Sequence, residues 1–145
     1  MSTPKAMLSK NFSLDEASCP CCGKVVIVEQ QVQAMQELRE IVKVPIIITS
    51  WFRCEKKNKE AGGVPGSYHT RGMATDFHVK YMLVRQMYAA ALKIEEFRNG
   101  GLGLYPSNAF IHADCRGYHA RWAKVKDKDG KLKQVSIDKI YPEES

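Results

Sequence analysis

Long apolar runs are absent from this 145-residue chain, and no stretch approaches the roughly 20 residues that a membrane-spanning helix requires. The first seven residues also lack the apolar segment of a secretory signal peptide. The five cysteines are an odd number, which argues against a complete disulfide framework. Repeats and an interdomain linker are missing as well. The sequence therefore predicts no transmembrane segment and one ordinary domain over residues 1–145.

The charge of the chain is basic: 22 lysines and arginines stand against 16 acidic residues, which gives a net charge of +6. This charge fits an ordinary soluble surface, and it equally fits attraction to a polyanion such as a teichoic acid, lipopolysaccharide or a nucleic acid. A nucleic-acid-binding motif is absent, so the charge does not favour DNA or RNA, and we expect no nucleic-acid partner.

Apolar patterning predicts helices mixed with short strands, and hence an α+β domain in which helices pack on one sheet. Apolar residues recur every three or four positions over Val28–Val42 and again over Leu83–Ile94, which predicts two amphipathic helices, the second ending before Asn99. Pro45–Ser50 is β-branched and apolar, so we expect a buried strand there, and another strand over Met73–Val79. Shorter elements are also expected. A capping box lies at Ser13–Glu16 and a helical turn at Cys54–Ala61. Two strands are expected over Gly101–Tyr105 and Ala109–Asp114, and a hairpin is expected to pair Ala120–Lys126 with Lys131–Ile137.

Two clusters along the chain combine imidazoles with carboxylates. His69 and Asp76 lie seven residues apart across a glycine, and His112 and Asp114 follow further along. Two imidazoles and a carboxylate are the usual protein set for a catalytic zinc ion that keeps one position open for water. Asp76 lies within an apolar strand, where an unpaired carboxylate carries a large desolvation cost that a cation would remove. The alternative partners for Asp76 are two arginines, Arg53 and Arg71.

Several sequence words around these residues resemble the M15 zinc peptidases, in the right order. Ser67–Asp76 resembles the signature SxHxxGxAxD, and Thr49–Arg53 resembles the S-G-Y-R element. Ala61–Val64 resembles the glycine pair that precedes the signature serine. Gly101–Gly117 and then Ala120–Trp122 resemble the run G-x-G-x-Y-P to F-V-H-x-D-x-R-G and A-R-W of the subgroup with HxD rather than HxH.

The resemblance covers roughly residues 10–122, which leaves residues 123–145 as a C-terminal hairpin and tail. It implies the fold shared by hedgehog domains and D-Ala-D-Ala peptidases, with a single mainly antiparallel sheet and helices packed on it. It also implies hydrolysis of peptide bonds in peptidoglycan, by an enzyme of the D-Ala-D-Ala carboxypeptidase or endopeptidase type.

The resemblance also implies roles for individual residues. Zn²⁺ ligands are expected at His69, Asp76 and His112. The chain departs from the family at Ala109, where other members carry the carboxylate that acts as general base. Asp114 shares a strand face with His112, and we assign it to catalysis as the base or as a partner that orients an imidazole. A ligand role in place of a second histidine is the third alternative for Asp114.

Two further residues complete the expected site. Arg53 follows a strand and is expected to bind the substrate carbonyl or the developing oxyanion, with a structural ion pair as the alternative. Ser67 is expected either to contact substrate or to brace its loop. Trp122 is expected in the core rather than at the substrate.

The expected activity is hydrolysis of stem or cross-bridge peptides by a metal-activated water, with peptidoglycan peptides as the partner and a monomeric chain. The alternative is a non-catalytic, zinc-containing module on the same fold that binds the cell wall or another protein. Because the chain shows no signal peptide, action at the cell wall would fit a phage lysin or a chain that has lost its leader.

Four cysteines are left over from this site: Cys19, Cys21 and Cys22, together with the distant Cys54. The first three are dense enough to suggest a second, structural metal, with Cys54 as a further ligand. Their spacing is CxCC rather than the CxxC of a zinc knuckle, and free buried thiols are the favoured interpretation. Cys115 is expected to pack within the fold.

Overall fold

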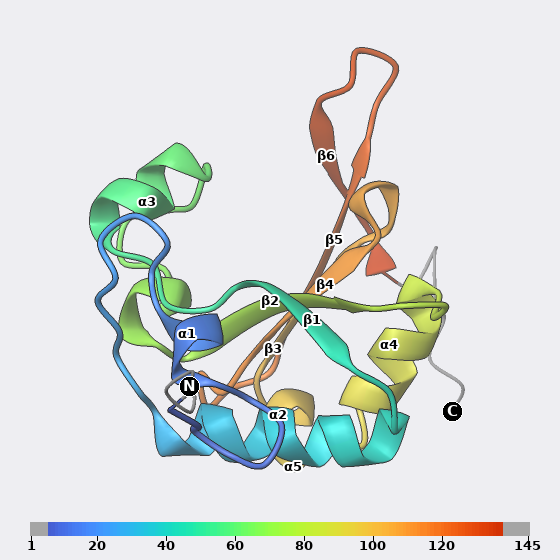
Figure 1. The fold of residues 1–145 in the computed structure, drawn as a ribbon. Helices are drawn as coiled ribbons and strands as arrows, with labels where there is room; N and C mark the ends of the chain where they lie inside the picture. Colours follow the sequence, from blue (N-terminus) through green and yellow to red (C-terminus); the bar gives the residue numbers. More distant parts are fainter. Residues whose placement is uncertain (1–5, 138–145) are drawn as a thin grey trace.

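The computed structural model describes residues 6–137, which form one six-stranded sheet in the order β1-β2-β4-β3-β5-β6 (Figure 1). Neighbouring strands of this sheet are antiparallel except β3 and β5, which are parallel. The prediction of an α+β fold with a single mainly antiparallel sheet is therefore confirmed. The α-helices are Leu14–Ala17 (α1), Glu29–Val42 (α2), Glu55–Glu60 (α3), Val84–Ala91 (α4) and Glu95–Arg98 (α5). The strands are Ile46–Ser50 (β1), Ala74–Val79 (β2), Gly101–Tyr105 (β3), Phe110–Asp114 (β4), Ala120–Lys126 (β5) and Leu132–Val135 (β6), with 3₁₀ turns at Tyr68–Arg71 and Pro106–Asn108.

Two expected features of the secondary structure are wrong. The single helix expected from Leu83 to just before Asn99 is broken: α4 ends at Ala91, and the chain is extended at Ile94, with φ −94° and ψ 118°, before α5 begins. This break lets Ile94 and Phe97 both turn into the core, where each is almost fully buried. β1 is also not a buried strand, because it lies at one edge of the sheet and leaves Ile47 42% exposed.

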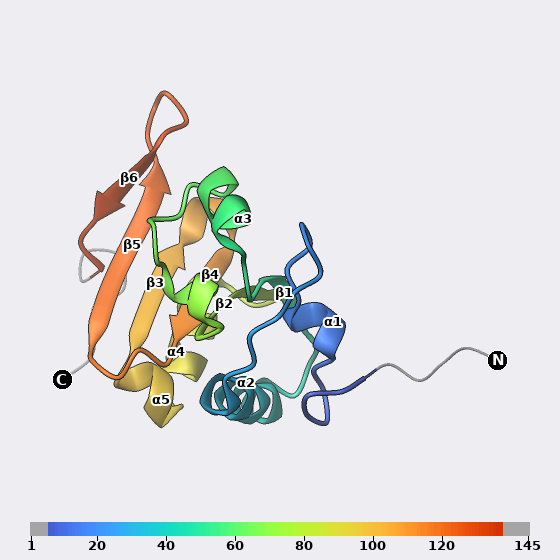
Figure 2. The same ribbon diagram turned by 90° about the vertical axis from the view of Figure 1, so that its left-hand side faces the viewer.

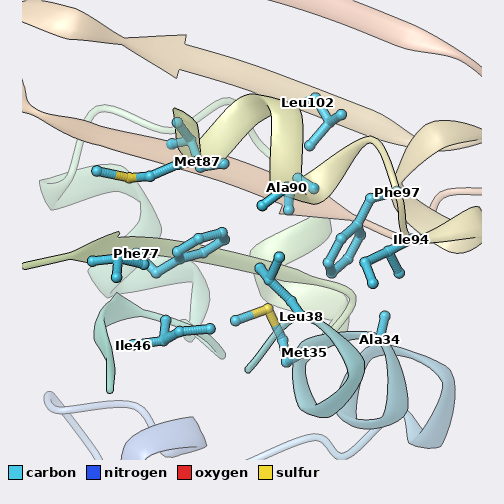
Figure 3. Packing of buried hydrophobic residues seen from close by; sticks show 14 of the residues in the cluster. Ala34, Met35, Leu38, Ile46, Phe77, Met87, Ala90, Ile94, Phe97 and Leu102 are labelled. Atoms are coloured by element: carbon cyan, nitrogen blue, oxygen red, sulfur yellow. The ribbon is translucent and has the colours of Figure 1, made fainter. Parts of the chain in front are cut away.

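The two faces of the sheet have different roles. α2, α4 and α5 cover one face, and the core between them and the sheet is apolar (Figure 3). Side chains alternate along a strand, so Phe77, Leu102 and Ile111 enter this core. Their neighbours Asp76 and His112 lie on the opposite face, which is where the candidate site forms.

A C-terminal hairpin extends the sheet on the side of the site. β5 and β6 pair antiparallel around the turn at residues 127–130, and the hairpin projects beyond the body of the domain (Figures 1 and 2). This confirms the hairpin predicted from the sequence, whereas the predicted tail at residues 142–145 lies outside the described residues. Within the described chain, no helix is long and apolar enough to cross a membrane.

Candidate metal centre

The fold brings three potential metal ligands together from two strands and a 3₁₀ turn. Asp76 of β2 pairs directly with His112 of β4 across the sheet, and His69 lies in the turn that precedes β2. One ligand atom of each residue lies within 4.8 Å of the other two. His69 and His112 are buried, and Asp76 is partly exposed at the site. The expected ligands thus converge on one point.

The turn that carries His69 depends on Gly72. This residue ends the turn with φ +72°, a left-handed conformation that glycine adopts without strain. A Cβ atom at this position would also lie 2.2 Å from the carbonyl oxygen of Val26, so a larger residue would clash with backbone. The glycine of the SxHxxGxAxD word therefore places the histidine.

Hydrogen bonds fix which nitrogen of each imidazole faces the centre. Nδ1 of His69 lies 2.7 Å from the carbonyl oxygen of Trp51, which can only accept, so this nitrogen carries the proton. Nε2 of His112 donates in the same way to Oδ2 of Asp114 at 2.7 Å. The remaining nitrogens, Nε2 of His69 and Nδ1 of His112, both face Oδ1 of Asp76, at 3.1 and 3.0 Å.

With neutral imidazoles, this arrangement directs three lone pairs at one another. Such a set is stable only if a cation lies between the three acceptors or if protons are added to both imidazoles. Burial lowers the pKa of His112. The hydrogen bonds of His112 to Asp114 and Asp76 outweigh this effect and raise its pKa to about 8. Burial raises the pKa of Asp76, but the charge of His69 and hydrogen bonds from both imidazoles hold it well below its usual value. The donor set of two imidazole nitrogens and one carboxylate oxygen fits a divalent metal such as Zn²⁺, which prefers these ligands.

Asp114 lies behind His112 rather than at the centre. Its carboxylate is fully buried and accepts hydrogen bonds from Gly101 N at 2.9 Å and from the Arg116 guanidinium at 2.9 and 2.7 Å. Burial raises the pKa of Asp114, but hydrogen bonds from His112 and Arg116 lower it well below its usual value. Asp114 does not line the cavity over the metal site. Of its three possible roles, this geometry favours the partner that orients an imidazole.

A cavity of about 590 Å³ opens over the centre. Its wall includes His69, Asp76 and His112, and Asp76 is the only carboxylate on the lining formed by the described residues. Three cationic side chains also line it: Arg53, Arg116 and Lys124.

The sequence of the chain identifies its family. The profile of the family described as Peptidase M15 matches residues 10–114, which is more than half of the chain. The chain belongs to the peptidase M15 family. The resemblance seen in the sequence words is thereby confirmed.

Named relatives match only part of the chain. It is 36% identical over 75 residues to the peptidoglycan L,D-endopeptidase MepK of Escherichia coli (strain K12), which covers 48% of this chain and 40% of the relative. It is 36% identical over 59 residues to the probable peptidoglycan L,D-endopeptidase MepK of Haemophilus influenzae, which covers 41% of this chain and 30% of the relative. The chain thus spans less than half of either relative, and no solved structure matches it.

In this M15 member, Arg53 and Ser67 both line the cavity but differ in their contacts. Nε of Arg53 is buried and has no hydrogen-bond partner among the described residues. Burial lowers the pKa of Arg53, and the nearby charge of Asp76 opposes this effect. Ser67 Oγ instead donates to Oδ1 of the buried Asn58 at 2.8 Å. Arg53 is thus available to a ligand, whereas Ser67 braces its loop.

Trp122 and Tyr105 complete the cavity, and the expectation that Trp122 lies in the core is wrong. The Trp122 indole lies against His112, with ring centroids 5.0 Å apart, and donates from Nε1 to the Tyr105 hydroxyl at 3.0 Å. The close approach depends on Gly103, because a Cβ there would lie 2.3 Å from the indole ring. Gly103 and Tyr105 belong to the sequence word G-x-G-x-Y-P, and Trp122 belongs to A-R-W. Neither word indicates that these residues meet beside His112.

His78, His119 and Cys115 lie away from the metal group. His78 pairs with Ile47 at the far end of β2, and His119 is exposed in the loop before β5. Cys115 is buried, as expected, and its thiol lies 3.8 Å from the carbonyl oxygen of Met73. Arg116, two residues after Asp114, forms an ion pair that holds the Asp114 carboxylate in place.

Proposed function

We propose that the chain is a zinc-dependent peptidase that hydrolyses peptide bonds in peptidoglycan stem or cross-bridge peptides. The observation that carries this proposal is the convergence of His69, Asp76 and His112 on one point at the base of a cavity. Membership of the peptidase M15 family supports the reaction class. The Escherichia coli relative is named a peptidoglycan L,D-endopeptidase, and this similarity supports the substrate class.

His69 and His112 would each hold the ion through one imidazole nitrogen, and Asp76 would hold it through one carboxylate oxygen. A bound Zn²⁺ would lower the pKa of a water molecule and polarise the scissile carbonyl. Trp51 and Asp114 keep the protons of His69 and His112 on the nitrogens that face away from Asp76, which leaves the other two nitrogens free to hold a metal. Such outer partners fix ring orientation and raise ligand basicity. We therefore assign Asp114 as a positioning residue.

Arg53 is the residue that we assign to the oxyanion. Its guanidinium lines the cavity, and its buried Nε lacks a partner among the described residues, so a substrate oxygen would satisfy that donor. A preorganised donor of this kind stabilises charge that develops in the transition state. The additional cations Arg116 and Lys124 would attract the carboxylates of peptidoglycan peptides.

Digestion of purified sacculi by the zinc-loaded chain tests the proposal, with the released muropeptides identified by mass spectrometry. We expect peptide-bond cleavage that disappears in His69→Ala and persists in Asp127→Asn, a control in the hairpin turn whose side chain does not line the cavity. The products also distinguish the subtypes: a carboxypeptidase releases single D-alanine residues, and an endopeptidase opens cross-links. Intact muropeptides after digestion with a zinc-replete, folded chain would refute the proposal.

The second candidate is a zinc-containing module that binds the cell wall without cleaving it. The favouring observation is that Asp114 stays out of the cavity, so Asp76 is the only lining carboxylate among residues 6–137 that could accept a proton from water. Cosedimentation with sacculi separates the candidates. Zinc-dependent binding without released products would support the module, and product release would exclude it.

A further inference from the structure

Four cysteines outside the peptidase centre gather at one place in the fold. Cys19, Cys21 and Cys22 lie in the loop after α1, and Cys54 lies directly before α3. The Sγ atoms of Cys19, Cys22 and Cys54 all lie within 4.8 Å of one another. The loop passes beside α3 (Figure 1), although 35 residues of sequence separate Cys19 from Cys54. All four thiols are free.

The loop has the shape of a metal-binding turn. Cys19 and Cys22 form a C-x-x-C pair within the longer C-x-C-C run, and C-x₂-C is a common spacing at structural zinc sites. The turn is closed by Gly23 N donating to Cys19 O at 2.8 Å and by Cys19 N donating to Lys24 O at 2.8 Å. Gly23 has φ +74°, which allows the chain to reverse directly after the second thiol.

Backbone amides are also directed at the sulfur atoms. Lys57 N donates to Sγ of Cys54 at 3.5 Å, so this thiol caps α3. Burial raises the pKa of the Cys19 thiol, but hydrogen bonds from three neighbouring backbone amides and from the Cys54 thiol lower it to about 7. Amide donors stabilise sulfur as thiolate, which is the form that binds metals.

Neither packing nor a disulfide accounts for the cluster. Cys21 and Cys22 are exposed, so the burial of apolar surface does not explain their position. The sulfurs of Cys19 and Cys54 are 3.7 Å apart, well beyond the roughly 2.05 Å of a disulfide. A bond between these two would also leave the third clustered thiol unused. Thiolates at the corners of a zinc tetrahedron with Zn–S bonds of about 2.3 Å lie roughly 3.8 Å apart, close to the 3.7 Å between the sulfurs of Cys19 and Cys54.

We propose that Cys19, Cys22 and Cys54 bind a second, structural zinc ion, with Cys21 as the fourth ligand. The Cys21 thiol already interacts with that of Cys54. Four thiolates close the tetrahedral shell, which is typical of a structural rather than a catalytic zinc. Binding releases the protons of those thiols that are not yet ionised.

The site would connect the N-terminal loop to the wall of the cavity. Cys54 caps α3, and Asn58 of α3 donates from Nδ2 to the carbonyl oxygen of Val64 at 2.7 Å. The same side chain accepts the hydrogen bond of Ser67, two residues before His69. Val64 and Ser67 both line the cavity. The second zinc would therefore hold one wall of the peptidase site in position.

Zinc content per chain tests the inference, measured by elemental analysis on the full chain purified under reducing conditions. We expect two zinc ions per wild-type chain, one in Cys22→Ser/Cys54→Ser, one in His69→Ala/His112→Ala, and two in the matched control Cys115→Ala. Substitution by Co²⁺ supplies a second readout. Sulfur-to-cobalt charge-transfer absorption should appear in the wild type and the histidine variant and be lost in the cysteine variant.

The outcomes separate this site from the peptidase centre. One zinc per wild-type chain that is lost in the histidine variant and kept in the cysteine variant overturns this inference and leaves the proposed function standing. A Cys19–Cys54 disulfide in the mapped peptides of the zinc-loaded chain also overturns it. If the double cysteine variant does not fold, the zinc affinity of the single variant Cys22→Ser, at an exposed position, tests the site instead. Loss of this ligand should weaken zinc binding more than about tenfold. An unchanged affinity there refutes the site.

Discussion

Replacement of Asp114 by asparagine separates a positioning role from a catalytic one. The carboxylate accepts five hydrogen bonds in the structure. Oδ1 takes those from Gly101 N, Arg116 N and Arg116 Nε, and Oδ2 takes those from His112 Nε2 and Arg116 Nη2. An asparagine whose oxygen occupies the Oδ1 position keeps the first three. Its amide nitrogen then faces two donors and can accept from neither.

His112 can restore a contact only by changing its tautomer. If Nε2 becomes the acceptor, the proton moves to Nδ1, which is the nitrogen that faces Asp76 and the metal position. Besides the hydrogen bond from Arg116 Nη2, the variant therefore loses either the ligand lone pair or the charge-assisted hydrogen bond from His112, which is worth about 1.5–3 kcal/mol. This corresponds to a zinc affinity lower by about 10- to 100-fold, the range found when outer partners of metal ligands are removed.

Competition with a chromophoric zinc chelator measures the affinity, and kcat is measured at saturating zinc. We expect Asp114→Asn to bind zinc 10- to 100-fold more weakly and to regain most of its turnover when zinc saturates the site. Asp127→Asn is the matched control, because among the described contacts its carboxylate bonds only within the hairpin turn and does not line the cavity. A general base would behave differently, with unchanged zinc affinity and a kcat lower by about 10²- to 10⁴-fold even at saturating zinc. That result would refute the positioning role.

Four further substitutions probe the centre and its supports. His69→Ala should abolish activity and bind zinc too weakly to survive dialysis, and retention of zinc at the peptidase centre would exclude His69 as a ligand. Arg53→Lys should keep zinc and melting temperature but lower kcat by about 10²- to 10³-fold; a less stable variant with normal turnover would assign the arginine to the scaffold instead. Gly103→Ala should displace the Trp122 indole and destabilise the fold by about 1–3 kcal/mol in denaturant titration, and an unchanged midpoint would contradict the close packing. Asn58→Ala removes two hydrogen bonds from the cavity wall and should raise KM more than it lowers kcat; equal effects on both would argue against a role in shaping the cavity.

Local sequence determined much of the architecture and the identity of the candidate ligands. The apolar period over Val28–Val42 predicts α2 because a helix buries one face. Strand alternation places Asp76 and Phe77 on opposite faces of β2, since successive side chains of a strand point in opposite directions. The sequence words around His69, Asp76 and His112 also indicate the family, which the match to residues 10–114 confirms.

Only the tertiary structure decided what surrounds these residues. The role of Asp114 depends on Arg116 and on the register of β3 against β4, which places Gly101 N at its carboxylate. The exposure of β1 follows from its place at the sheet edge, which no local pattern encodes. The cluster of Cys19 with Cys54 arises because the chain folds back over 35 residues. Such contacts depend on strand order and register, and therefore on the energy of the whole fold rather than on any one segment.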